Sequence, residues 1–124
     1  MRLSTLLFRV SIILLLVGLC MGIGMGITQD FRLKDTHAHL NLIGFVILFM
    51  TGLYYRAIPA AEALGLAKAH AYLHIVAAIV LPTGVAALTL YGPAYEIIAI
   101  VGAFIFLAAM ALFAIVVYRT TAQA

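Results

Sequence analysis

Residues 97–118 read IIAIVGAFIFLAAMALFAIVVY and contain no charged side chain. An α-helix needs about 20 mainly apolar residues to cross the hydrocarbon core of a bilayer, so this run predicts a transmembrane helix. Further apolar runs of similar length precede it in the sequence. The four helices predicted for this all-α integral membrane bundle cover residues 6–27, 36–56, 68–90 and 96–118.

The composition leaves little room for a soluble domain. The 124 residues are 67% hydrophobic and only 9% charged, which is typical of a membrane protein. A membrane-spanning β-barrel would show short alternating segments instead of long apolar runs. We therefore expect residues 1–124 to form a single four-helix transmembrane domain, with any chemistry within or beside its helices.

The first run begins after Arg2 and includes Arg9, as a cleaved signal peptide could. We expect it to remain as a helix, because it is longer than a signal-peptide core and no small residue directly precedes Cys20. A single cysteine cannot form an internal disulfide, and its place in an apolar helix indicates packing.

Basic residues are divided unequally between the two predicted membrane surfaces. Cytoplasmic loops carry an excess of Lys and Arg, so we expect both termini in the cytoplasm, in the inner membrane of a bacterium. This bias accounts for the net charge of +3, and we infer no nucleic-acid partner. The two groups are Arg2, Arg9, Arg56, Lys68 and Arg119 on one side, and Arg32 and Lys34 on the other.

Gly18, Gly22 and Gly26 recur at intervals of four in the first predicted helix. Small residues at this spacing let helices approach closely in lipid, where burying apolar surface provides no drive to associate. We expect this face to pack against another helix, either of the same chain or of a neighbouring copy.

The four histidines fall near the ends of predicted helices. An ionisable side chain is costly in a membrane without a partner, so histidine there indicates a ligand, a proton carrier or a hydrogen-bonding group. Asp35 or Thr36 is expected to cap the second helix, which places His37 and His39 in its first turn. Successive residues turn by about 100°, so these two histidines face different flanks and cannot easily share one metal ion.

His70 and His74 are four residues apart and share a helix face, which suits one small metal ion as a second, weaker site. We expect His39 near the outer surface and His74 about 9 Å from the inner one, too far apart for a shared ion. A second chain could complete the first site. In a closed ring, His37 of one copy would stand opposite His39 of the next, which predicts a cyclic homo-oligomer.

Residues 37–59, HAHLNLIGFVILFMTGLYYRAIP, resemble a helix of the catalytic subunit of haem-copper oxidases and nitric oxide reductases. In that family the helix starts with His-x-His, continues through an apolar run with a glycine, and ends with an aromatic pair and a proline. The resemblance covers about a fifth of the chain. The matching residues are His37, His39, Gly52, Tyr54, Tyr55 and Pro59.

The resemblance implies that His37 ligates a high-spin haem and His39 a low-spin haem, in different pores. The family's subunit is similar to three four-helix arcs around a pseudo-threefold axis, so a single arc implies a homotrimer. The chain lacks the adjacent histidine pair of the family's copper site. The resemblance therefore implies haem binding more strongly than oxygen reduction by a complete oxidase.

Three functions are compatible with the sequence. The first is a haem b protein that transfers electrons through bis-histidine haem shared between protomers, or binds a diatomic gas at an open position. The second is a copper- or zinc-binding membrane protein, and the third an accessory subunit without a cofactor. Polar side chains that could surround a haem or pair with its propionates are Asn41, Tyr54, Tyr91, Tyr95, Arg32 and Lys34.

Overall fold

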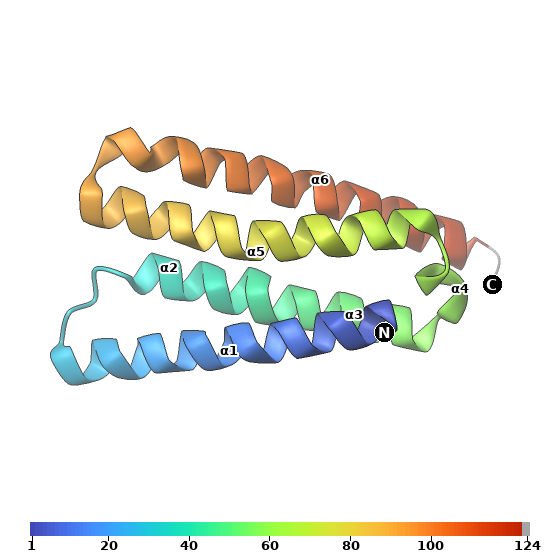
Figure 1. Ribbon diagram of the computed structural model, residues 1–124, viewed down its shortest axis with the longest axis horizontal. Coiled ribbons are helices and arrows are strands. Elements are labelled where there is room, and N and C mark those ends of the chain that lie inside the picture. Colours follow the sequence, from blue (N-terminus) through green and yellow to red (C-terminus); the bar gives the residue numbers. More distant parts are fainter. Residues whose placement is uncertain (123–124) are drawn as a thin grey trace.

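The computed structural model describes residues 1–122, which form antiparallel helical rods without any strand (Figure 1). The second rod, Lys34–Ala57, runs without a break through an α-helix, a π-helix and another α-helix. In chain order the elements are α1 (Leu3–Thr28), α2 (Lys34–His39), η1 (Leu40–Ile47, π-helical), α3 (Leu48–Ala57), α4 (Pro59–Glu62), α5 (Gly65–Tyr91), η2 (Pro93–Tyr95, a 3₁₀-helix) and α6 (Glu96–Thr121).

Within the described residues, four helical stretches are long and apolar enough to cross a membrane. Each contains its predicted helix and extends beyond it by one to three residues at either end. This confirms the prediction of an all-helical chain with four helices long and apolar enough to span a membrane, and it is consistent with an integral membrane protein. The observed stretches are Leu3–Thr28, Lys34–Ala57, Gly65–Tyr91 and Pro93–Thr121.

The helices are arranged as two antiparallel hairpins side by side (Figure 1). Helix α1 packs on η1 and α3, α5 packs on α6, and the hairpins meet where α2 and η1 contact α5. In the most apolar stretch of each helix, only 17% is buried in α1 and in α6, against 39% in the second rod and 33% in α5. The outer members, α1 and α6, therefore keep most of their apolar surface available to lipid.

The outer helices bury residues that recur every seven positions. This spacing keeps one side of a helix against its neighbour at a shallow crossing angle. Most of these residues are small, which lets the backbones come close in lipid. The buried residues at this spacing are Ser4, Ser11, Gly18 and Met25 in α1, and Gly102, Ala109 and Val116 in α6.

Gly102 lies at a close approach between α6 and α5. A Cβ atom there would lie 2.7 Å from Leu81 Cα, so one backbone would have to move. Gly102→Ala is expected to lower the free energy of unfolding by about 1–3 kcal/mol, measured by thermal unfolding in detergent. Gly24→Ala is the matched control, since its Cβ would meet nothing within 4 Å. Equal losses in both variants would contradict the close contact.

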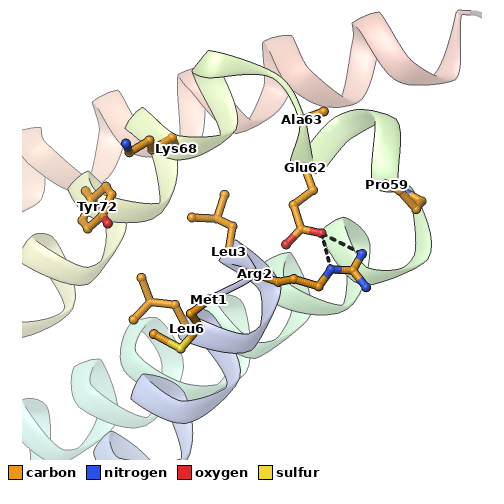
Figure 2. A pocket seen from close by; sticks show the side chains of 9 residues that line it. All are labelled: Met1, Arg2, Leu3, Leu6, Pro59, Glu62, Ala63, Lys68 and Tyr72. Carbon is orange, nitrogen blue, oxygen red and sulfur yellow. Dashed lines mark hydrogen bonds and ion pairs between the residues drawn. The ribbon is translucent and has the colours of Figure 1, made fainter.

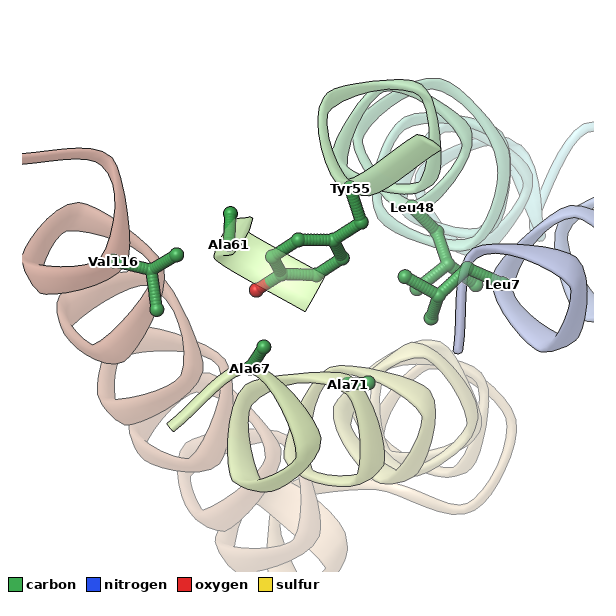
Figure 3. Close-up of a cluster of buried hydrophobic side chains, with 7 residues drawn as sticks. All are labelled: Leu7, Leu48, Tyr55, Ala61, Ala67, Ala71 and Val116. Atoms are coloured by element: carbon green, nitrogen blue, oxygen red, sulfur yellow. The ribbon is translucent and has the colours of Figure 1, made fainter. Parts of the chain in front are cut away.

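One end of the bundle, which we name the termini end, holds the start of α1 and the end of α6 (Figure 1). The Tyr55 side chain lies there between the second rod and the start of α5, beside Ala61 and Ala67 (Figure 3). Its ring is fully buried. Arg56 and Lys68 lie at this end also, as the uneven charge distribution predicted; that this side is cytoplasmic stays a prediction.

Candidate functional site

His37 is anchored to the first helix. Its Nδ1 lies 2.8 Å from the Gly18 carbonyl oxygen, and since a carbonyl only accepts, Nδ1 carries the proton. In the neutral ring Nε2 then holds a lone pair, which lies 3.2 Å from the Asn41 side-chain nitrogen. Asn41 Oδ1 is buried and has no hydrogen-bond partner within residues 1–122.

Glycines of α1 make room for this pair. A Cβ at Gly22 would lie 2.9 Å from His37 Cε1, and one at Gly18 would lie 3.0 Å from Asn41 Cγ. A Cβ at Gly24 or Gly26 would meet nothing within 4 Å. The predicted small-residue face therefore packs within its own chain at Gly18 and Gly22.

His39 is half-buried and hydrogen-bonded only to its own helix. Its Nδ1 lies 2.7 Å from the Asp35 carbonyl oxygen, so this nitrogen is the protonated one in the neutral ring. Nε2 keeps a lone pair that no hydrogen bond within residues 1–122 uses. Because His37 instead contacts α1, the two rings serve different surroundings, in line with the predicted difference in direction.

The predicted cap of the second helix is wrong. Helix α2 begins at Lys34 after Leu33, and no side chain caps it. Asp35 and Thr36 lie within the first turn instead of before it. The Thr36 hydroxyl is buried and has no hydrogen-bond partner in the part of the chain that the structure describes.

His70 and His74 belong to a buried row of hydrogen bonds. The Tyr55 hydroxyl oxygen lies 2.8 Å from His70 Nδ1, His70 Nε2 lies 3.3 Å from His74 Nδ1, and His74 Nε2 lies 3.1 Å from the Ile43 carbonyl oxygen. Both imidazoles are fully buried. The row joins α3 and η1 to α5 through three side chains and the backbone carbonyl of Ile43.

The carbonyl at one end fixes the direction of this row. Ile43 O can only accept, so His74 Nε2 donates, and for neutral rings His74 Nδ1 accepts from His70 Nε2. His70 Nδ1 then accepts from the Tyr55 hydroxyl. Neither ring has a carboxylate partner within residues 1–122, and burial favours the neutral form. Every ring nitrogen of the pair is thus hydrogen-bonded inside the protein.

The contact with Ile43 places His74 at a different depth from the expected one. Ile43 follows His39 by four residues, which is about 6 Å along a helix. The two pairs of histidines are therefore closer in depth than the positions along their helices indicated. The π-helical turns of η1 take up more residues for each turn than an α-helix does, and they change which atoms face α5.

Within residues 1–122, no three His, Cys, Asp or Glu side chains gather where they could hold one ion. His70 and His74 lie together but use their nitrogens for hydrogen bonds, and His37 and His39 are directed apart. A second metal site at His70 and His74 stays a prediction.

Several polar side chains considered from the sequence have partners of other kinds. The Tyr54 hydroxyl lies 2.7 Å from Thr120 Oγ1, and the Tyr91 and Tyr95 rings are 5.7 Å apart. Arg32 forms an ion pair with Asp30 at 2.8 Å. The hydrogen bonds from Arg32 lower the pKa of Asp30 to about 2.

A second polar cluster ties α4 to the start of α1 (Figure 2). Glu62 accepts hydrogen bonds from the Ser4 amide at 2.8 Å and the Ser4 hydroxyl at 3.0 Å, and pairs with Arg2 at 3.0 Å. Burial acts to raise the pKa of the Glu62 carboxyl, but the hydrogen bonds and the charge of Arg2 outweigh it, so the pKa is lowered. The ionised carboxylate thus satisfies free donors at the α1 N-terminus.

Glu62→Gln is expected to destabilise the protein by about 1 kcal/mol at pH 7, because the carboxylate's charge-assisted bonds are lost. A lowered pKa means that the stabilisation is present above the carboxyl's unfolded-state pKa and is lost as the pH falls through its folded-state pKa. The melting temperatures of wild type and variant should therefore converge in acid. A difference that persists unchanged at pH 3 would contradict the role of the charge.

The two pairs of histidines differ in their surroundings. His37 and His39 are partly buried and each bonds to a backbone carbonyl through Nδ1, whereas His70 and His74 are fully buried and hydrogen-bonded to each other. No family model, curated protein or solved structure matches this chain. From the sequence, Tyr55 was only part of a motif, and His70 and His74 were a weak metal site. The row of hydrogen bonds that they form together was not predicted. The i, i+4 spacing of the histidines was the signal that these two belonged together.

Proposed function

We propose that this chain binds haem b in the membrane and that His39 Nε2 is an iron ligand. The observation that carries the proposal is the hydrogen bond from His39 Nδ1 to the Asp35 carbonyl. Metal-binding histidines commonly donate the other ring N–H to a carbonyl or carboxylate, which fixes the tautomer and the orientation of the ring. His39 has this arrangement, with Nε2 free to coordinate.

His37 fits the role of a second ligand after a local rearrangement. Its Nδ1 also donates to a carbonyl, and its Nε2 is covered by the Asn41 amide. Asn41 Oδ1 has no partner in the described part of the chain, so only the 3.2 Å contact with His37 engages this amide. Rotation of Asn41 would remove this contact, and the ring would also have to turn away from Gly22 of α1, beside which Nε2 lies.

The two ligands of one chain would serve two different haems. His37 packs toward α1, whereas His39 does not, so each iron would take His37 from one copy and His39 from the next. The exposed apolar surfaces of α1 and α6 could supply the contacts between copies. Such head-to-tail contacts form a closed ring where the rotation between copies closes, and the family resemblance favours three copies.

The proposed haem would supply one-electron chemistry with both axial positions filled, or bind a diatomic gas with one open. The chain's own contribution is to hold the two imidazoles in fixed tautomers through carbonyls of Gly18 and Asp35. A site for copper or zinc has less support, because the described residues form no group of three such ligands.

The absorption spectrum of the purified protein tests the proposal. We expect a Soret band and, as the pyridine haemochrome, about one haem b per chain, since a ring has as many interfaces as copies. The mass measured in mild detergent should correspond to an oligomer of several protomers, as a ring requires. A haem-loaded monomer would refute shared ligation, and a colourless, metal-free protein would favour the accessory subunit.

A further inference from the structure

A cavity of about 610 Å³ opens at the termini end between α1, α4 and α5. Figure 2 shows Leu3 and Leu6 of α1 on one side, with Lys68 and Tyr72 of α5 across from them. Apolar side chains form most of the wall, and charged groups stand at the ends of three separate elements. This cavity is distinct from the surroundings of His37 and His39, which lie toward the opposite end of the second rod.

The charges of the cavity are unbalanced. Arg2 and Glu62 neutralise each other as an ion pair. Lys68 forms no ion pair within residues 1–122. The cavity therefore keeps an excess positive charge beside an apolar wall, at the level where a helix leaves the membrane.

Arg9 adds a second cation that forms no ion pair within residues 1–122. It lies within the first membrane-crossing stretch, three residues after Leu6 and seven after Arg2, and so on the same face of α1. Its guanidinium contacts the sulfur of Met1, a cavity residue, at 3.6 Å. A thioether is a weak acceptor, and a charge at membrane depth is costly without a partner.

We propose that this cavity binds the phosphate headgroup of an anionic phospholipid, held by Lys68 and Arg9. Basic pockets beside transmembrane helices recognise anionic lipid headgroups. A lipid suits the site better than free phosphate, because its acyl chains can cover Leu3 and Leu6 while the phosphate balances the two cations. The proposal is independent of haem binding.

Lipid binding can be measured by native mass spectrometry of the full chain with phosphatidylglycerol or phosphatidylcholine. Wild type should prefer phosphatidylglycerol. Each cation contributes about fivefold in affinity, so Arg9→Gln with Lys68→Gln should reduce the preference by about 25-fold. Lys68→Arg should retain it, because the charge remains.

Lys34→Gln is the matched control, since it removes an exposed lysine at the other end of the bundle. Excess inorganic phosphate should displace little lipid. Retention of the helical circular dichroism spectrum establishes that the double variant is folded. Equal binding of both lipids by wild type, an equal loss in Lys34→Gln, or full displacement by phosphate would each overturn the proposal.

Discussion

His39→Ala is expected to remove most of the bound haem and leave the helices folded. The variant loses the Nε2 lone pair that no other group within residues 1–122 uses, so the proposed haem iron would lose its most accessible ligand. His39 is only half-buried, and its truncation should cost little stability. The measurement is the haem-to-protein ratio of the purified variant, from the pyridine haemochrome.

Two controls separate ligation from a general structural effect. Added imidazole should restore the Soret band of His39→Ala, because it can occupy the vacated coordination position. His74→Ala should retain most of its haem per folded chain, since His74 Nε2 is occupied by the Ile43 carbonyl. Equal haem losses in the two variants would refute the assignment of His39 as the ligand.

His74→Ala is expected instead to lower the free energy of unfolding by about 2–5 kcal/mol. The substitution leaves a cavity between η1 and α5, and it removes the partners of both His70 Nε2 and the Ile43 carbonyl. Buried polar groups without partners are costly. Thermal or denaturant unfolding in detergent, followed by circular dichroism, gives the difference.

Tyr55→Phe provides a graded comparison. It keeps the buried ring and removes only the hydroxyl at the start of the row, so the expected loss is about 1 kcal/mol. His39→Ala should unfold close to wild type. If His74→Ala were as stable as His39→Ala, the buried row would not contribute to the fold.

The helices were predictable because the bilayer fixes their length and demands apolar side chains. The packing faces were not, since α1 and α6 are apolar on every side and hydrophobicity does not mark the inner one. Small residues mark it instead. Gly18 and Gly22 were recognised, but the interval of seven that links Gly102 to Ala109 passed unnoticed among similar alanines.

The arrangement of the candidate histidines was predictable where it depended on geometry within one helix, and their role as ligands stays a prediction. The turn of about 100° per residue separated His37 from His39 without knowledge of other helices. The hydrogen-bond partners of His37 and His74 are more distant in the sequence: Gly18 precedes His37 by 19 residues, and Ile43 precedes His74 by 31. Ile43 lies within the π-helical turns of η1, and the sequence contains no simple signal for these turns.

The hydrogen-bonded row from Tyr55 to Ile43 has a consequence for the insulation of the membrane. Imidazoles in succession can relay protons, and such a relay across a bilayer would let protons leak down their gradient. Here the last acceptor is an amide oxygen, which is too weak a base to take up a proton and pass it on. The row therefore links the second rod to α5 and ends at a group that does not pass a proton on.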